Sequence, residues 1–253
     1  MGIVETGRVT AQRRVGPQMW QMRLALPRIA AAIRPGQFIH LRRDGAHEPL
    51  LRRPFSPSRV DAATGTVELI YRVVGRGTAA MTQWADGTAV DVLGALGTTF
   101  TLGGRLLMVG GGVGIAPLMY AAQECAPETV TALIGGRNRD EVFWAELFPP
   151  TVTDIRIATD DGSIGHHGYV PELVPALLES GAYTRVLTCG PAVMMRAVAA
   201  MAEAAGVPCE VSLERRMGCG TGGCLACVCD RRAGGHAKVC LDGPVFDSRE
   251  VRL

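Results

Sequence analysis

Four cysteines near the carboxyl terminus constrain this 253-residue chain more than any other feature. They follow the spacing Cys219-x4-Cys224-x2-Cys227-x12-Cys240, and glycines are frequent among the first three. This spacing matches the plant-type pattern for a [2Fe-2S] cluster, in which three thiolates come from one loop and the fourth from a distant segment. Glycines suit such a loop because they tolerate positive φ and let backbone amides approach sulfide. The sequence therefore predicts that these four cysteines bind a [2Fe-2S] cluster.

Two alternatives remain open for the cysteine segment. A four-cysteine zinc site is the first, although zinc ribbons usually pair two C-x2-C hairpins, and here the second pair is missing. The second is ligation by Cys229 in place of Cys227, which would require the spacing C-x4-C-x4-C. We expect Cys229 to be a neighbouring free thiol.

Charge and the amino-terminal residues limit the partners and the compartment. The formal net charge is only +2 and has no long runs, so charge gives no reason to propose a nucleic-acid or anionic-membrane partner. Residues 1–15 lack the apolar core of a secretory signal. Glycines and Pro117 interrupt the uncharged run 106–123, which therefore predicts a strand, a loop and a helix rather than a membrane span. We expect a cytoplasmic protein, where clustered thiols more often bind metal than form disulfides.

Hydrophobic patterning divides the chain into three parts. Residues 1–102 carry short β-like segments at 37–43 and 67–74 and several glycine-containing turns, which predict a small barrel or sandwich. In residues 103–213, apolar strands alternate with helical stretches, the signature of a doubly wound α/β domain with a mainly parallel sheet. We expect these helices near 115–125, 140–147, 171–179 and 191–205. Residues 214–253 lose regular apolar periodicity and form the cysteine-rich tail.

A glycine-rich turn follows the first strand of the α/β part. Its glycines precede a helix with Pro117 in the first turn, where proline is tolerated; they are Gly110, Gly111, Gly112 and Gly114. Such a turn lets a pyrophosphate lie against free amides at a helix start. The pattern is not G-x-G-x-x-G, and similar turns also occur without a ligand. We predict a nicotinamide nucleotide here.

Two further strand ends support this nucleotide site, because ligands of open α/β sheets bind beyond the carboxyl ends of the strands. The ends are 158–163 and 188–191, and the second supplies Cys189, Gly190 and Pro191 as predicted contacts. Two alternatives stay open: Cys189 as a buried thiol, and Asp160 and Asp161 as turn formers. The residues at 135–137 do not separate NAD from NADP.

Two motifs in the barrel part suit a flavin nucleotide. In 53–56, an arginine stands three residues before a serine, so it could hold a phosphate while the hydroxyl reaches a ring nitrogen. In 71–78, a strand ends in a glycine pair followed by a hydroxyl, which suits phosphate contacts at a helix start. For the first motif, the alternative is that the strand arginines, including those at 42, 43 and 52, are simply solvated. For the second motif, the alternative is a strand-to-helix turn that binds no ligand.

Together these motifs resemble the ferredoxin-reductase-like flavoproteins, most closely the electron-transfer subunits of type B dihydroorotate dehydrogenase. The resemblance rests on R-P-F-S, Y-R-V-V-G-x-G-T, GGGVGIAPL, ERRMGCGTGGCLAC and CLDGPVF, which span most of the chain. It implies an FAD-binding barrel, an NAD-binding α/β domain, and cluster ligation by Cys219, Cys224, Cys227 and Cys240. It implies FAD contacts with Arg53 towards the pyrophosphate and Ser56 near the isoalloxazine, and further contacts at Pro54, Phe55, Ile70, Tyr71, Arg72, Gly77 and Thr78.

The order of the cofactors follows from their chemistry. NAD moves a hydride, an iron-sulfur cluster takes one electron at a time, and a flavin does both, so FAD must stand between them. The resemblance implies that orotate forms on a separate FMN-containing catalytic subunit, in a heterotetramer of two subunits of each kind that serves pyrimidine (UMP) biosynthesis. No catalytic residue for dihydroorotate is therefore expected in this chain.

Two rival functions remain. The first is an NAD(P)H-dependent reductase subunit that serves a hydrogenase, sulfide-reducing or glutamate-synthase-like partner. The second is a zinc-stabilised nucleotide-binding module without a redox role.

Overall fold

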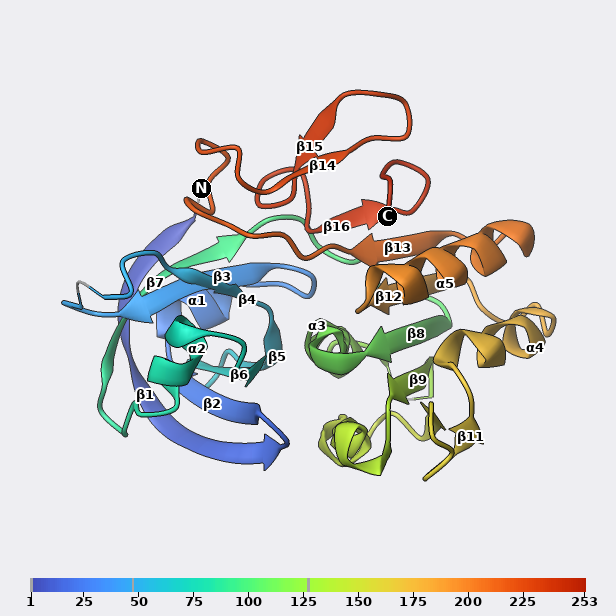
Figure 1. Ribbon diagram of the computed structural model, residues 1–253, viewed down its shortest axis with the longest axis horizontal. Helices are drawn as coiled ribbons and strands as arrows, with labels where there is room; N and C mark the ends of the chain where they lie inside the picture. Colours follow the sequence, from blue (N-terminus) through green and yellow to red (C-terminus); the bar gives the residue numbers. More distant parts are fainter. Residues whose placement is uncertain (1, 47, 127) are drawn as a thin grey trace.

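Two seven-stranded sheets lie side by side in the computed structural model, which describes residues 2–46, 48–126 and 128–253 (Figure 1). The first sheet is antiparallel and contains the strands before residue 97; the second is largely parallel. The cysteine-rich tail lies across the top of both in this view. This arrangement confirms the predicted fold class of a β-barrel beside an α/β domain.

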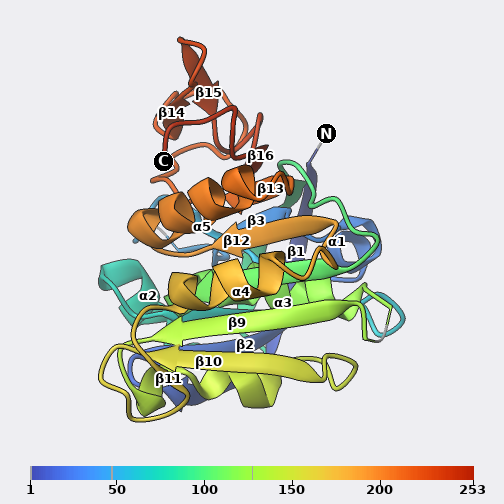
Figure 2. The same cartoon turned by 90° about the vertical axis from the view of Figure 1, so that its right-hand side faces the viewer.

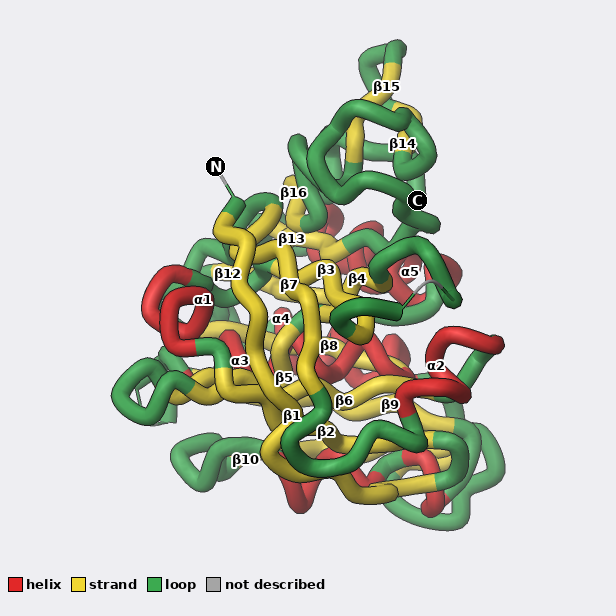
Figure 3. Tube along the Cα trace, turned by 90° about the vertical axis from the view of Figure 1, so that its left-hand side faces the viewer, coloured by secondary structure: helices red, strands yellow, loops and turns green. Residues whose placement is uncertain are grey.

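The antiparallel sheet forms a nearly closed barrel. Its strands run in the spatial order β4-β3-β7-β1-β2-β6-β5. Their bounds are β1 (Ile3–Gly16), β2 (Met19–Ala25), β3 (Phe38–Arg43), β4 (Arg53–Phe55), β5 (Pro57–Asp61), β6 (Thr66–Arg72) and β7 (Ala89–Leu96). Only Ser56 separates the edge strands β4 and β5 in the chain, so the backbone itself joins the two edges. The strands visible in Figure 3 curve around an apolar interior that includes Met22, Ile39 and Tyr71.

Alternation and glycine turns account for the barrel strands. The segments predicted at 37–43 and 67–74 are β3 and β6. The turn glycines Gly36, Gly45, Gly65 and Gly87 all have positive φ, the region that L-residues with a side chain avoid. Two short helices complete the barrel part, α1 (Pro27–Ala32) and α2 (Arg76–Met81).

The second sheet has a topological switch point beside its first strand. Its spatial order is β11-β10-β9-β8-β12-β13-β16. The bounds are β8 (Leu106–Gly111), β9 (Val130–Gly136), β10 (Asp154–Thr159), β11 (His166–His167), β12 (Arg185–Cys189), β13 (Cys209–Ser212) and β16 (Val245–Asp247). The chain continues from β8 to β9 on one side and later places β12 on the other. In open α/β sheets ligands bind at such a point, beyond the carboxyl ends of the strands.

Helices cover both faces of this sheet. The helix α3 (Ile115–Gln123) lies on the face towards the barrel, and α4 (Val174–Leu178) and α5 (Ala192–Ala204) lie on the other face (Figures 1 and 2). The uncharged run 106–123 is thus β8, a turn and α3. Within the described residues, no helix has both the length and the apolar character needed to cross a membrane.

The α-helix predicted at 140–147 is wrong, and that at 171–179 is partly so. Arg139–Glu141 and Phe143–Leu147 are short 3-10 helices, and Trp144 is completely buried against the barrel-facing side. Tertiary burial of bulky side chains overrides the helical pattern in this segment. The second stretch starts as a 3-10 helix over Val170–Leu173 before α4, because Pro175 has no N–H for a continuous helix.

The tail is more ordered than its composition indicates. A hairpin of β14 (Val228–Asp230) and β15 (His236–Lys238) projects from the body (Figures 2 and 3). Beyond it, β16 adds to the second sheet, antiparallel to β13. Three-residue strands are too short to show a periodic pattern, so the sequence did not predict them.

Residues 243–245 of the tail connect the two sheets. The Thr98 N–H, just after β7, donates to the Gly243 carbonyl at 2.7 Å. The Thr98 hydroxyl donates to the Val245 carbonyl at 2.8 Å and accepts from the Val245 N–H at 3.1 Å. The Leu213 N–H, just after β13, donates to the Pro244 carbonyl at 2.9 Å. One short segment therefore bonds to the barrel exit and to the edge of the second sheet.

Thr98→Val should weaken this connection. It leaves the Val245 N–H and carbonyl without their partner, and we expect the free energy of unfolding to fall by about 1–3 kcal/mol. For a chain of this size the melting temperature should fall by about 2–4 °C per kcal/mol, measured by thermal denaturation. Thr10→Val, on an exposed position of β1, is the control and should change it little. Equal melting temperatures for the two variants would contradict the connection.

Candidate functional site

A cleft of about 320 Å³ lies where the barrel, the second sheet and the tail meet. The barrel contributes Phe38, Arg53, Pro54, Phe55, Ser56, Ile70, Tyr71, Arg72, Val74 and Thr78. The second sheet contributes Val113, Ala116, Pro117, Leu213, Glu214 and Arg215, and the tail contributes Met217 and Pro244. Eight of the nine predicted flavin contacts therefore line one cavity, although β4 and β6 carry them at separate places in the sequence.

The ninth predicted contact, Gly77, lies against the side chain of Arg53. A Cβ at Gly77 would overlap Nε of Arg53, so the guanidinium packs directly on the backbone at the start of α2. Arg53 also donates hydrogen bonds to the carbonyls of Pro49, at 3.2 Å, and Leu51. These contacts fix a cation at the cleft wall. Partial burial lowers the pKa of Arg53, but a guanidinium keeps its charge in proteins.

The hydroxyl of Thr78 holds the turn before α2. It accepts hydrogen bonds from the N–H groups of Val74, at 2.9 Å, and Gly75, at 3.2 Å. It also donates to the Gly75 carbonyl at 3.1 Å. The strand-to-helix turn that stood as the alternative therefore accounts for this hydroxyl.

Two arginines beside the flavin motif are paired rather than solvated. Asp91 accepts from Arg52 at 2.7 and 2.9 Å and from Arg42 at 2.9 Å. Burial alone would raise the pKa of Asp91, but these hydrogen bonds outweigh it and hold the pKa below its usual range. The network anchors the residue before Arg53. The alternative of solvated arginines is wrong for Arg42 and Arg52, whereas Arg43 is exposed.

Packing explains three of the glycines in the predicted nucleotide turn. A Cβ at Gly114 would lie 2.6 Å from the backbone of Cys189, and one at Gly110 would lie 2.7 Å from the Ile115 side chain. At Gly111 the nearest atom would be the Met194 sulfur, at 2.9 Å. Gly112 differs, because it has a φ of +58° and only Arg72 lies within 4 Å of its Cβ position. The open face of the turn therefore points towards the barrel.

The second strand end adjoins this turn. Cys189 pairs with Gly110 in the parallel register, and a Cβ at Gly190 would lie 2.8 Å from the Gly111 carbonyl oxygen. Pro191 follows as the cap of α5. Cys189 is buried, and burial raises its thiol pKa far above the ordinary value. The thiol therefore packs below the predicted nicotinamide site.

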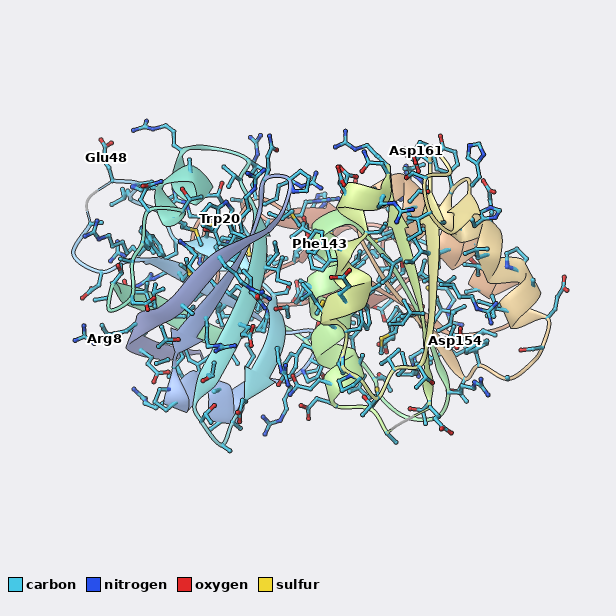
Figure 4. All side chains as sticks on the ribbon, turned by 90° about the horizontal axis from the view of Figure 1, so that it is seen from below. Arg8, Trp20, Glu48, Phe143, Asp154 and Asp161 are labelled. Carbon is cyan, nitrogen blue, oxygen red and sulfur yellow. The ribbon has the colours of Figure 1, made fainter. Side chains whose placement is uncertain are left out.

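Asp160 and Asp161 stand beyond the end of β10. Asp161 accepts the Ser163 N–H at 2.9 Å, so it is a turn former. The backbone N–H of Asp160 donates to the Gly136 carbonyl at 3.1 Å. Figure 4 shows Asp154 and Asp161 at opposite ends of this strand, so Asp161 marks the carboxyl edge of the sheet.

Glu214 is a cleft residue that the sequence reasoning missed. It follows β13 by two positions and its side chain is open to the cleft. The protein atoms crowded around the carboxyl group nevertheless raise its pKa by desolvation. The rule that ligands bind beyond strand ends, applied to the end of β13, would have found it.

Backbone amides surround the four cysteine sulfurs of the tail. Cys219 Sγ accepts from the N–H groups of Thr221 and Cys224, each at 3.4 Å. Cys224 Sγ accepts from Cys219 at 3.3 Å, Cys227 Sγ from Cys240 at 3.4 Å, and Cys240 Sγ from Gly222 at 3.2 Å. Amide donors of this kind stabilise thiolate ligands and tune iron-sulfur clusters. The donor set therefore fits an iron-sulfur cluster.

The cysteines also fall into two pairs. Cys219 and Cys224 exchange amide contacts with each other, and Cys240 donates to Cys227. Two thiols for each of two irons suit a [2Fe-2S] cluster. The N–H groups of Thr221 and Cys224 lower the pKa of Cys219 to about 6, which favours its thiolate. Cys229 is buried in the small core of the hairpin with Ala237 and Val239.

The fold, the cleft and the cysteine segment together define a ferredoxin-reductase-like flavoprotein with an iron-sulfur segment. Residues 6–100 match the family described as an oxidoreductase FAD-binding domain, and residues 214–252 match the iron-sulfur cluster binding domain of dihydroorotate dehydrogenase B. The chain is 39% identical to the electron transfer subunit of dihydroorotate dehydrogenase B (NAD(+)) from Desulforamulus reducens, over 99% of each chain. It is also 39% identical to that of Geobacillus thermodenitrificans, over 97% of each. The chain belongs to this family of electron transfer subunits.

Solved structures share the fold. An NADH-dependent reduced ferredoxin-NADP oxidoreductase, studied for flavin-based electron bifurcation, superposes with a TM-score of 0.86 at 28% identity, covering 97% of this chain and 89% of that one. A ferredoxin NADP+ reductase from Neisseria gonorrhoeae, solved with FAD and NADP, has a TM-score of 0.64 at 18% identity, covering 80% and 92%. At that identity the second likeness concerns the fold alone.

Gly77→Ala should weaken FAD binding without unfolding the barrel. The new methyl group would overlap the guanidinium of Arg53 and displace it from its place on the cleft wall. Loss of one charged hydrogen bond should raise the dissociation constant by about tenfold or more, measured by flavin fluorescence titration of the flavin-depleted chain. The control is Gly75→Ala, since no atom lies within 4 Å of that Cβ position. Equal FAD affinity in the two variants would exclude this role for Arg53.

Proposed function

We propose that this chain relays electrons between NAD(H) and a catalytic subunit that oxidises dihydroorotate, through FAD and a [2Fe-2S] cluster. The observation that carries the proposal is the single cleft bounded by the flavin motifs, the carboxyl edge of the second sheet and the cluster segment. A chain that only bound a nucleotide would not need the flavin motifs, the sheet edge and the cluster segment to line the same cleft. The relatives named above support the physiological role, because they are electron transfer subunits of dihydroorotate dehydrogenase B (NAD(+)).

Different residues of the cleft have different roles in the proposed relay. FAD, when bound, supplies the exchange between hydride and single-electron chemistry. Arg53 binds the pyrophosphate, Ser56 hydrogen-bonds to the flavin ring, and Ile70, Tyr71 and Arg72 form the wall behind it. Phe55 packs edge-to-face on Tyr71 with 5.9 Å between ring centroids, which stiffens that wall. Thr78 keeps the turn at Gly77 in place, and Pro54 keeps β4 extended.

The nicotinamide nucleotide binds across the turn at Gly112 and the strand end at Gly190. The close contact between Gly111 and Gly190 leaves no side chain to block this edge. Glu214, beyond the end of β13, contributes a carboxyl group to the cleft wall, and desolvation raises its pKa. A nicotinamide bound at this edge would supply hydride to a flavin held in the cleft.

We propose the division of the chain into an FAD-binding barrel (1–102), an NAD-binding domain (103–213) and a cluster-binding tail (214–253). The family matches at 6–100 and 214–252 support the outer two parts. The tail is not independent, because β16 adds to the second sheet.

Orotate formation belongs, in this proposal, to an FMN-containing partner subunit, in a heterotetramer of two chains of each kind within pyrimidine (UMP) biosynthesis. The described histidines support this assignment because none converges with an acid on the cleft. His166 pairs with Glu172 at the sheet edge, at 2.8 Å, and His236 with Asp230 in the hairpin, at 3.0 Å. His47 lies outside the described residues.

A reductase that serves another acceptor is the second candidate. The 28% identity to the NADH-dependent reduced ferredoxin-NADP oxidoreductase favours it, since that protein shares 97% of this chain's length. The relatives at 39% identity favour the dihydroorotate system.

Cys224→Ser tests the relay in the reconstituted complex. The wild-type chain with the dihydroorotate-oxidising subunit should reduce NAD+ with dihydroorotate. The variant should lose this activity while both flavins stay bound, because a hydroxyl is a poor iron ligand. Cys125→Ser is the control, since that thiol only donates to the Ala121 carbonyl on α3. Unchanged NAD+ reduction in the Cys224 variant would refute the relay.

A further inference from the structure

One buried histidine in the barrel has no partner for either ring nitrogen. His40 lies on β3 with 1% of its surface exposed, and neither Nδ1 nor Nε2 has a hydrogen-bond partner among the described residues. Leaving a buried polar group unpaired costs about 1–3 kcal/mol. Buried polar groups of native proteins are nearly always satisfied, so an exception needs an explanation.

The ring of His40 lies between the flavin strand and the cluster loop. On one side, His40 pairs with Pro54 of β4 in the antiparallel register. On the other side, a Cβ at Gly220 would lie only 2.6 Å from Nδ1, so the imidazole rests on the backbone next to Cys219. Gly220 has a φ of +74°, which lets the loop approach this closely. Among the four glycines of the segment 218–223, only Gly220 has a barrel side chain close to its Cβ position.

The backbone groups nearest to His40 are acceptors. They belong to Arg52 and Cys219. A neutral imidazole carries one N–H, which can donate to such an acceptor. Arg52 belongs to the segment that enters β4, and Cys219 is the first predicted cluster ligand. Both lie near the ring, yet neither meets it in hydrogen-bond geometry.

We propose that His40 is a positioning residue of the cluster: its single N–H donates to the Cys219 backbone once the cluster is in place, and ties the cluster loop to the flavin-binding strand. This inference rests on the proposed function, because it requires the cluster at the four cysteines. It explains why an imidazole, rather than an aliphatic side chain, occupies this buried position next to the Cys219 backbone. It also gives the barrel a direct polar contact with the segment that accepts electrons.

Substitution of His40 by leucine distinguishes a hydrogen-bonding role of the imidazole from a purely space-filling role. His40→Leu keeps most of the volume and removes the donor, while His40→Gln restores a donor. In the loaded chain, the leucine variant should lose iron about 10- to 100-fold faster on dilution with a chelator, the range found for outer-shell partners of metal ligands. The midpoint potential of the cluster should also shift, because loss of the contact loosens the loop whose backbone amides donate to Cys219 Sγ, and hydrogen bonds to the sulfurs set the potential. The glutamine variant should recover a large part of each.

The cluster-free full chain supplies a second measurement. There, His40→Leu removes an unpaired polar group, so the free energy of unfolding should stay equal or rise. In the loaded chain the same substitution should lower it. If His40 had a purely structural role, the substitution would change the free energy of unfolding in the same direction in the cluster-free and the loaded chain.

The matched control is Ile39→Val, one position earlier on β3, where the side chain points into the barrel core. It should cost about 0.5–1.5 kcal/mol and leave the EPR spectrum and the potential unchanged. Should His40→Leu fail to fold, His40→Met, which also lacks an N–H donor, takes its place. A methionine variant with wild-type FAD content, a shifted midpoint potential and faster iron loss supports the contact, and one identical to wild type in spectrum, potential and iron retention overturns it.

Failure of this inference differs from failure of the proposed function. If the wild-type chain holds no cluster, the proposed function falls. If it holds one and His40→Leu matches it in EPR spectrum, potential and iron retention, only the role of His40 falls.

Discussion

The hydrogen bonds of residues 243–245 are the constraint on which the cleft depends. This segment bonds to Thr98 at the barrel exit and to Leu213 at the end of β13, and it continues into β16 of the second sheet. Around α3 the two parts meet through apolar contacts and a second set of hydrogen bonds: Gln123 bonds to the N–H and carbonyl of Val60, and the Tyr120 hydroxyl donates to the Ile33 carbonyl at 3.0 Å. Together with these, the connection at residues 243–245 fixes the separation of the two sheets, and with it the width of a cavity whose walls come from both. It also brings Cys240, three residues earlier, beside the cysteine loop.

Glycine has two distinct uses around this cleft. At Gly114, Gly111 and Gly190 the backbone of one element touches the backbone or side chain of another, so the absence of a Cβ allows the strand ends to pack closely. At Gly112 and Gly220 the positive φ turns the chain towards the barrel. The first three glycines allow the carboxyl ends of the strands to pack closely. Gly112 turns the nucleotide loop towards the flavin-binding wall, and Gly220 turns the cysteine loop towards His40. Composition alone does not separate these uses.

Sequence reasoning predicted the parts of the structure that depend on local pattern. Alternation marked β3, β-branched and aromatic residues marked β6, and apolar runs marked the parallel strands. The choice of Cys219, Cys224, Cys227 and Cys240 as cluster ligands, made from their spacing, stays a prediction. Sequence reasoning failed where tertiary packing decides, as in the 3-10 helices around Trp144, whose burial is a property of the whole fold. The pairing of Arg42 and Arg52 with Asp91, 39 or more positions away, has no local signal. Neither has the contact of His40 with Gly220, since nothing in β3 points to the tail.

The central claim is that electrons pass from NADH to the cluster only through FAD in this one chain. Anaerobic addition of NADH to the purified chain, followed by visible absorption and EPR, tests it most directly. The account predicts that the flavin bands bleach and that the EPR signal of a reduced [2Fe-2S] cluster appears. In flavin-depleted chain the signal should appear with dithionite but not with NADH, and added FAD should restore the response to NADH. Reduction of the cluster by NADH without FAD, or bleaching of the flavin with no cluster signal, would contradict it.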